Sequence, residues 1–297
     1  MYADTRMKGG LLMKKVVVLL LSLLILTSPV LAEEARTSGP WEYILTDQGA
    51  VLTNWMYYAD SYILPDVVEI PAELGGQPVV GIGYNALNTY EMDSKISFTL
   101  IISEGVQWLS DDVFQCCHNA DVIVFPASLT EIPEGCFDHV YATFIVAEGN
   151  PRYEMRDGFL IDKQEDAIVY TTPECQGKPI PAVRRIGACS MDNWVSEWGQ
   201  DLVIPEGVEV IGSYAFYDWE FTHVTLPESL RLIESMAFDV SITEPVVVPT
   251  GVETVEYWAF SGCGGRPIEV IPASESTHFE TADEYEARTG ERHWLDN

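Results

Sequence analysis

The stretch VIPEGVEVIGSYAF, from Val203 to Phe216, decides how the rest of the chain is interpreted. Its glycines, Gly207 and Gly212, suit either a loop that holds a ligand or a turn of a scaffold. The same pattern returns twice, as VTLPESLRLIESMAF ending at Phe238 and VVVPTGVETVEYWAF ending at Phe260, with a spacing of 22 residues each time. A catalytic loop would normally occur once, so the stretch is interpreted as one unit of a repeat.

Earlier parts of the chain contain the same unit. In the regular copies the residue at the proline position precedes the phenylalanine by 11 residues, although one copy has Ser103 instead of proline. A looser copy runs from Val67 to Leu87, and a degenerate copy places Met191 where phenylalanine usually stands. The sequence therefore predicts about seven units in all. The regular copies end at Phe114, Phe137, Phe216, Phe238 and Phe260.

Each unit indicates its own local structure. A β-branched run before the proline favours a strand, and the proline ends that strand because it has no N–H to donate. Glycine two residues after the proline, at Gly105, Gly207 and Gly251, permits a turn with positive φ. The final Ala-Phe pair is predicted to pack inside. One unit cannot bury its own apolar face, so the units are predicted to stack into a mainly β solenoid, with a parallel sheet on one face and turns or short helices on the other.

The phrase Ile-Pro-x-x-Val-x-x-Ile-Gly-x-x-Ala-Phe resembles the BspA-type leucine-rich repeat family of bacterial surface and secreted proteins. The resemblance covers about Val67 to Pro272. It implies a leucine-rich-repeat-like fold and an association with adhesion and with host or glycan contact. The opening from Trp41 and the segment VAEGNPRYEMRDGFLIDKQEDAIVYTTP also look like this family's usual start and its common hairpin insertion.

Residues 1–32 are predicted to be an export signal, with the true start at Met13. Lys14 and Lys15 precede an apolar run that is too short to span a membrane, and Ala32 marks the expected cleavage site. The alternative is an uncleaved N-terminal anchor.

The rest of the chain is expected to be an N-terminal cap (33–66), a solenoid (67–272) with a hairpin insertion at 149–173, and a C-terminal cap (273–297). In that last cap a helix over 282–289 follows a capping box, and Trp294 is expected to tuck beneath it.

The chain is strongly acidic, with 46 Asp and Glu against 16 Lys and Arg and a net charge of −30. This excludes general affinity for nucleic acids and anionic lipids, which need basic patches. Apolar residues make up 47% of the chain, which is enough for a buried core.

Export would permit disulfides, but the six cysteines match neither a zinc site nor a small stapled scaffold. Buried free thiols are expected, and a Cys116–Cys136 disulfide stays open as an alternative.

The sequence offers no motif for chemistry. It has no nucleophile elbow, no dinucleotide-binding loop and no calcium loop. Its abundant carboxylates, such as Asp111-Asp112, are interpreted as a solvated acidic surface. No catalytic, cofactor-binding or metal-binding residue is therefore predicted, and no cofactor is expected.

A candidate binding surface follows from the strand pattern. If the residue before each proline and its i−2 neighbour point inward, the residue between them points outward. These residues would form a β-branched, largely uncharged stripe, and repeat proteins usually bind along such extended faces. The alternative is that the stripe reflects strand propensity alone or is covered by another segment. The predicted outward residues are Ile101, Val124, Ile145, Val203, Thr225 and Val247.

Three tryptophans are candidates for additional contacts. Trp194 and Trp198 lie four residues apart in a polar insertion, and Trp219 follows Phe216. Exposed tryptophans stack on sugars or anchor protein interfaces. The alternative is that they cover the core beside the degenerate coil of Met191.

Together these features predict a secreted, non-enzymatic, adhesion-type protein that presents its sheet face to a protein or glycan ligand. It is expected to be monomeric and extracellular, either free or held at the cell surface, with no nucleic-acid partner and no stable membrane insertion after cleavage. A structural spacer without a ligand on the sheet is the alternative, and an enzyme is the least favoured function.

Overall fold

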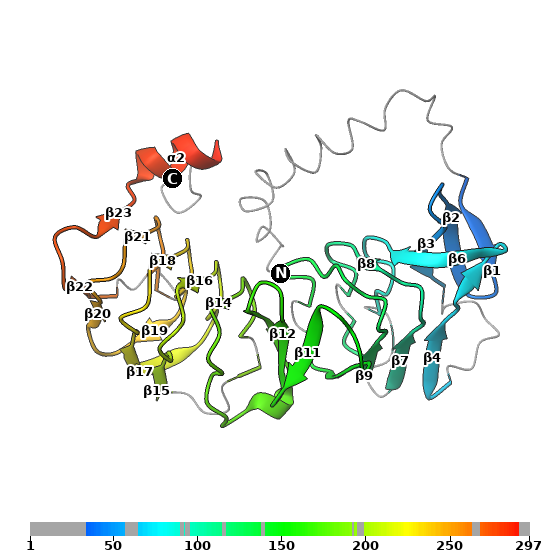
Figure 1. Ribbon diagram of the computed structural model, residues 1–297, viewed down its shortest axis with the longest axis horizontal. Helices are drawn as coiled ribbons and strands as arrows, with labels where there is room; N and C mark the ends of the chain where they lie inside the picture. The colour runs from blue at the N-terminus through cyan, green and yellow to red at the C-terminus, as the bar shows by residue number, and fades with distance from the viewer. Residues whose placement is uncertain are drawn as a thin grey trace.

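The computed structural model describes residues 34–56, 65–89, 92, 96–114, 117–137, 140–191, 193–194, 199–262 and 268–290. In this part the chain winds through successive coils of an elongated β-solenoid, so the predicted fold is confirmed (Figure 1). One ladder of strands runs along the lower side in Figure 1, and a second ladder of shorter strands runs along the upper side.

The lower ladder consists of the strands that precede the repeat prolines, and we call them the pre-proline strands. All of their pairings are parallel, as stacked coils require. The sheet orders are β10-β9-β7-β4 and β15-β17-β19, with β20-β22 at the C-terminal end. The pre-proline strands are β4 (Val67–Ile70), β7 (Phe98–Ile102), β9 (Ala120–Phe125), β10 (Thr143–Val146), β15 (Gln200–Val203), β17 (Glu220–Thr225), β20 (Val246–Val248) and β22 (Val270–Pro272); β19 (Ser241–Ile242) extends from β17.

The second ladder was not predicted. It is built from the residue pair that follows each turn, for example Val210-Ile211. The strands from Arg185-Ile186 to His278-Phe279 each pair in parallel with the counterpart in the next coil. Trp108-Leu109 belongs to a separate sheet, in which it pairs in parallel with Gly81-Ile82. Strands of two residues are too short to give a sequence signal of their own. They are β8 (Trp108–Leu109), β14 (Arg185–Ile186), β16 (Val210–Ile211), β18 (Leu232–Ile233), β21 (Thr254–Val255) and β23 (His278–Phe279).

The N-terminal strands close one end of this second ladder. An antiparallel meander of three strands continues in parallel pairing through β6 to β8. The meander carries Trp41 opposite Trp55, and their rings stack at 5.9 Å. The strands are β1 (Arg36–Ser38), β2 (Trp41–Leu45), β3 (Ala50–Trp55), β5 (Glu73–Leu74) and β6 (Gln77–Ile82).

The predicted hairpin insertion is present and divides the core. β12 (Phe159–Asp162) and β13 (Ala167–Thr171) pair antiparallel, β11 (Tyr153–Arg156) flanks β12, and the short 3-10 helix η1 (Pro173–Cys175) follows β13. Leu160 and Tyr170 belong to the N-terminal hydrophobic cluster, whereas Phe159, Ile161 and Ile168 belong to the C-terminal one. The two faces of the hairpin therefore belong to different hydrophobic cores, and the hairpin separates these cores.

The repeat phenylalanines stack along the axis of the solenoid. Phe216 and Phe238 lie 5.4 Å apart with an interplanar angle of 9°, and Phe114 and Phe137 lie 5.3 Å apart at 21°. The alanines before them, such as Ala215 and Ala237, are fully buried. The predicted inward Ala-Phe pair is confirmed.

The glycine prediction is partly wrong. Gly105 and Gly207 have φ of 108° and 103°, as predicted, but Gly251 does not adopt positive φ. A Cβ on Gly251 would lie 2.5 Å from the carbonyl oxygen of Glu228, so close approach of the neighbouring coil, and not turn conformation, requires glycine there. Gly212 is similar, because its Cβ would lie 2.6 Å from the backbone nitrogen of Ala188.

Left-handed residues do occur in these turns, two positions before the repeat phenylalanine or the residue that replaces it. Most are not glycine, although such a conformation costs about 1–2 kcal/mol for other residues. In the C-terminal coils Tyr214 donates its backbone N–H to Met236, which donates to Trp258. These hydrogen bonds between coils hold the unusual conformation. The residues are Asn85, Asp112, Gly135, Cys189, Tyr214, Met236 and Trp258.

The C-terminal cap contains the helix α2 (Ala282–Thr289). The predicted capping box is confirmed: the Thr281 side chain accepts from the backbone N–H of Glu284, and the Glu284 carboxylate accepts from Thr281. Gly290 ends the helix in the left-handed conformation. Trp294, which was expected beneath the helix, lies outside the described residues.

Candidate functional site

The outward side chains of the pre-proline strands are the main candidate surface. Val203 is 58% exposed, Val247 is 51% exposed and Ile145 is 49% exposed. Thr225 is also exposed, whereas Ile101 and Val124 are half-buried by their neighbours. All six predicted residues therefore lie on the outer side of the ladder.

Strand register brings the N-terminal members of this set together. Ile101 pairs with Val124 and Val124 with Ile145, while Glu69 of β4 pairs with Ile101 on the other side. A second outward row lies two residues earlier on the same strands, and the sequence analysis missed it although the alternation of a strand could have revealed it. Its members are Val67, Thr99, Val122 and Thr143.

A separate outward row lies on the C-terminal coils, and we call it the C-terminal row: Val203, Thr225, Val247 and Ile271. Val203 pairs with Thr225, Val247 pairs with Ile271, and β20 contacts β17. Ile271, which is 45% exposed, was missed because its coil lacks the full repeat phrase. The row is uncharged in a chain of net charge −30.

The predicted tryptophan contacts are not supported as the outward strand residues are. Trp194 is only 8% exposed and donates its indole N–H to the carbonyl of Lys178 at 2.9 Å, so its predicted role as a surface contact is wrong. It covers the core beside the degenerate coil, which was the alternative. Trp219 is half-buried and packs against the C-terminal cluster. Trp198 lies outside the described residues.

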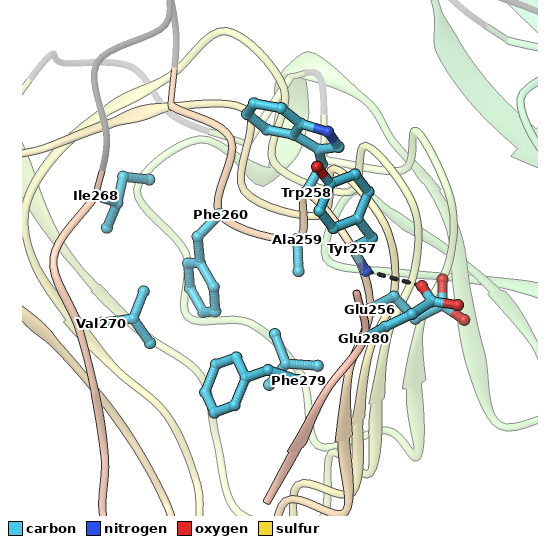
Figure 2. A pocket seen from close by; sticks show the side chains of 10 residues that line it. Glu256, Tyr257, Trp258, Ala259, Phe260, Ile268, Val270, Phe279 and Glu280 are labelled. Atoms are coloured by element: carbon cyan, nitrogen blue, oxygen red, sulfur yellow. Dashed lines mark hydrogen bonds between the residues drawn. The ribbon is translucent and has the colours of Figure 1, made fainter. Parts of the chain in front are cut away.

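A hollow lies at the C-terminal end of the solenoid (Figure 2). Its volume is about 320 Å³. Phe260 and Phe279 point into it, and Ile268 and Val270 line the side opposite Tyr257. It is the place where the phenylalanine stack ends in the described part of the chain, and its lining is mostly apolar. The sequence analysis did not predict it.

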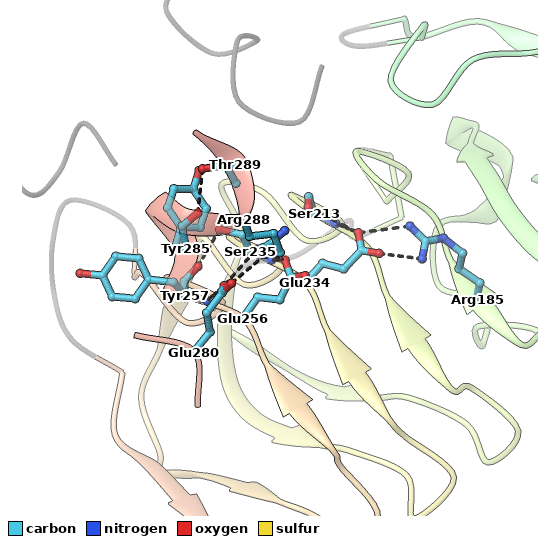
Figure 3. A network of polar contacts seen from close by, with 10 residues as sticks. All are labelled: Arg185, Ser213, Glu234, Ser235, Glu256, Tyr257, Glu280, Tyr285, Arg288 and Thr289. Atoms are coloured by element: carbon cyan, nitrogen blue, oxygen red, sulfur yellow. Dashed lines mark hydrogen bonds and ion pairs between the residues drawn. The ribbon is translucent and has the colours of Figure 1, made fainter. Parts of the chain in front are cut away.

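Three glutamates form a polar column on the second ladder (Figure 3). Each follows a strand of that ladder, and its carboxylate accepts the backbone N–H of a turn in the preceding coil, at 2.8–3.1 Å. The hydrogen bonds join Glu234 to Ser213, Glu256 to Ser235, and Glu280 to Tyr257. Because the position repeats and each carboxylate accepts a hydrogen bond from the preceding coil, the column is interpreted as structural: it links adjacent coils.

Arginines close both ends of this column. Arg185 lies 2.8 Å from Glu234, and Arg288 of α2 lies 2.7 Å from Glu280 and 3.1 Å from Glu256 (Figure 3). Burial raises the pKa of Glu256 above its usual value, although the Ser235 N–H and Arg288 oppose this. Burial would also raise the pKa of Glu280, but hydrogen bonds from Arg288 and Tyr257 outweigh it and the pKa is lowered.

Cys136 and Cys175 are free thiols. Cys117, Cys136 and Cys175 are buried, and Cys189 is half-buried. A Cys116–Cys136 disulfide is therefore not formed. Burial, reinforced by the carboxylates of Asp111 and Asp112, raises the pKa of Cys136 well above its usual value. Burial raises the pKa of Cys175 to about 12, so neither thiol is primed as a nucleophile.

The described residues contain no group of three or more His, Cys, Asp or Glu that could hold a metal ion. Within the same residues, no helix has the length and apolar character needed to cross a membrane.

Comparison with solved structures finds distant similarity. The chain shares 14% identity with the pneumococcal vaccine antigen PcpA, at a TM-score of 0.41, covering 85% of this chain and 89% of that one. It shares 16% identity with a leucine-rich cell surface protein of Faecalibacterium prausnitzii, at a TM-score of 0.38, covering 83% and 90%. A leucine-rich repeat protein of T. pallidum shares 20% identity at a TM-score of 0.34, covering 73% and 85%.

No curated protein matches the chain. A family model, the BspA type leucine rich repeat region, matches it in six copies over residues 81–150 and 197–278, which together make up just over half of its length. These matches cover the regular units ending at Phe114, Phe137, Phe216, Phe238 and Phe260, so the stacked coils described above are the repeats of this family. The chain belongs to the BspA-type leucine-rich repeat family.

Proposed function

We propose that this protein is an exported, non-enzymatic binding protein that holds a ligand, a protein or a glycan, on the outer side of its pre-proline strands. Proteins of its family are typically secreted or located at the cell surface and are often related to adhesion. The observation that carries the proposal is the alignment of outward β-branched side chains across neighbouring coils, from Ile101 to Ile145 and again along the C-terminal row.

Exposed apolar side chains are ordinary when they are scattered, but contiguous apolar area on a soluble protein usually marks an interface. Here the exposed residues occupy one face of successive strands, and their spacing is set by hydrogen bonding between coils. A repeat solenoid offers such a face as a continuous surface. Burial raises the pKa of Cys136 and of Cys175, which argues against either thiol acting as a nucleophile.

The binding proposal is tested by screening the purified protein against glycans and host proteins, followed by substitution. Val124→Glu and Val203→Glu place a charge on each half of the face, and we expect either the N-terminal or the C-terminal charge to weaken a detected interaction by at least about tenfold. Gln164→Glu adds the same charge in the exposed hairpin turn and is the control. If the double variant stays folded and binds like the parent, the face is not the binding site.

Export is tested separately. The native organism is fractionated, and the N-terminus of the protein is sequenced. We expect a mature chain that begins after Ala32 and is found outside the cytoplasm. A cytoplasmic protein that retains residues 1–32 would contradict the export part of the proposal and leave the binding part open to the screen.

A further inference from the structure

The charges around the C-terminal row indicate what kind of partner fits it. We propose that this row docks a basic amphipathic helix, whose apolar side chains lie on Val203, Thr225, Val247 and Ile271 and whose Lys and Arg side chains reach the carboxylates on either side. This inference rests on the proposed function and narrows its ligand to a cationic polypeptide.

Carboxylates line the side of the row that follows the prolines. Glu206 and Glu228 occupy equivalent positions in adjacent coils, and both are exposed. The carboxylate of Glu206 accepts the backbone N–H groups of Glu228 at 3.0 Å and Ser229 at 3.3 Å. Its position is therefore held by the next coil, so a cationic partner would meet a preorganised charge.

Carboxylates also line the other side. Asp201 lies two residues before Val203 on β15, where the burial pattern places both side chains outward, and Glu269 directly precedes β22, two residues before Ile271. Both are exposed. Between them, Glu244 lies 3.5 Å from Nδ1 of His223 on β17. The uncharged row thus runs between two rows of negative charge.

Lysine and arginine are absent from the described strands of this surface, where His223 is the one basic side chain. None of the eight described pre-proline strands contains Lys or Arg. The nearest basic residues before β7 and β22, Lys95 and Arg266, lie outside the described residues. A surface with one sign of charge favours a partner of the opposite sign and repels an anionic one. A second copy of this acidic chain would therefore be a poor occupant.

The spacing of the coils matches a helix that lies across them. Adjacent strands are about 4.8 Å apart, and one helical turn advances about 5.4 Å. A helix running along the row can place one apolar residue, at i, i+3 or i+4, opposite each strand, while its flanking positions carry charges toward both carboxylate rows. A glycan would form fewer favourable contacts here than a helix, because Trp194, the aromatic side chain predicted to stack on sugars, is buried.

The test uses three synthetic peptides of about 18 residues: a Leu/Lys amphipathic helix, its Leu/Glu counterpart, and a peptide with the Leu/Lys composition in an order that destroys the apolar face. Binding to the purified protein is measured by calorimetry at several salt concentrations. We expect only the first peptide to bind well, with an affinity that falls as salt rises. Equal binding of the reordered peptide would overturn the proposal.

Substitutions locate the binding. Asp201→Asn, Glu228→Gln and Glu269→Gln together are expected to weaken the Leu/Lys peptide roughly tenfold, since each exposed pair contributes modestly. Glu165→Gln, Glu209→Gln and Glu253→Gln remove three exposed carboxylates away from the pre-proline strands and are the matched control, with an expected change below about twofold. Equal losses in both triple variants would show non-specific attraction and overturn the proposal.

The outcome is separable from that of the proposed function. If the screen yields a neutral or anionic ligand whose binding is lost in Val203→Glu, the face binds a ligand but this inference is wrong. If Val124→Glu and Val203→Glu leave every detected interaction unchanged, both the proposed function and this inference are wrong.

Discussion

Phe238 and Phe260 are 22 residues apart in the sequence, yet their rings stack with centroids 5.0 Å apart and planes within 1° of parallel. The relationship repeats between Phe216 and Phe238. Because these three coils place ring on ring, the phenylalanine column keeps successive C-terminal repeats in the same register.

Replacing Phe238 with alanine removes the central member of this column. The side chain is fully buried, so we expect the free energy of unfolding to fall by about 3–5 kcal/mol. Chemical denaturation followed by circular dichroism measures the change. Tyr84→Ala is the control, because Tyr84 is 61% exposed and its loss should cost about 0.5 kcal/mol or less. Similar losses in both variants would mean that the column does not hold the coils together.

Asn150 ties the start of the hairpin to the coil before it. Its Nδ2 donates to the carbonyls of Pro126 and Leu129, both at 2.9 Å, and its Oδ1 accepts from the backbone N–H groups of Arg152 and Tyr153. The side chain is 2% exposed. All four of its hydrogen-bonding capacities are therefore used inside the protein.

Asn150→Asp keeps the shape of this side chain but replaces its donor with an oxygen that faces two carbonyls. We expect a loss of about 2–4 kcal/mol, because two buried acceptors lose their partner and a charge is buried near them. Thermal unfolding of Asn150→Asp and of Asn54→Asp, at an exposed position, checks this. An equal shift in melting temperature for the two variants would contradict the proposed anchoring role.

Cys175 should resist alkylation in the native protein. Burial raises its pKa to about 12, and only the thiolate reacts with iodoacetamide. At pH 8 we expect mass spectrometry to find Cys175 and Cys136 unmodified in the folded protein and modified after denaturation, while the half-buried Cys189 reacts sooner. Rapid labelling of Cys175 in the native protein would show that the hairpin region opens readily and exposes this thiol.

The repeat made the solenoid predictable from sequence alone. A constant offset between Pro205 and Phe216, repeated at the next two prolines, requires a constant backbone path. The outward position of Val203 follows from the same argument, because side chains alternate along a strand. Ligand identity does not follow, since the residues that would contact a ligand are not the ones that maintain the repeat.

Other features depended on contacts between coils and left weaker signals. The second ladder uses only two residues per coil, too few for a periodic pattern. The hairpin was visible as an insertion, and alternation places Phe159 and Leu160 on opposite faces of their strand. The sequence did not reveal that both faces are buried, each in a different hydrophobic cluster. Trp194 lies in a polar segment and was a candidate surface contact, but its ring is buried in the same cluster as Met191 of the degenerate coil, as the alternative held.

The glutamate column offers a signal that could have been used. Glu234 and Glu256 stand at the same repeat position, where a charge would be unexpected beside buried Ile233 and Val255 unless it had a partner. Their partners are backbone N–H groups of the adjacent coil. Stacking had to be known before those partners could be identified.

The same column gives a pH dependence that separates two of its carboxylates. Glu280 has a lowered pKa, so its charged form stabilises the folded state above its unfolded pKa near 4.5, and this contribution is lost as the pH falls through the lower folded value. Glu256 has a raised pKa. It therefore favours the folded state below its unfolded pKa, and that advantage disappears as the pH rises through the folded value.

Glu280→Gln should consequently lower the melting temperature at pH 7, where Arg288 loses one of its two ionic partners. The difference from the parent should shrink toward zero near pH 3. Glu256→Gln should cost less at pH 7, because glutamine can still accept the N–H of Ser235 and the unfavourable burial of a charge is removed. Melting curves of both variants and the parent between pH 3 and 8 provide the measurement. A larger loss for Glu256→Gln than for Glu280→Gln at pH 7 would show that Arg288 holds the cap mainly through Glu256.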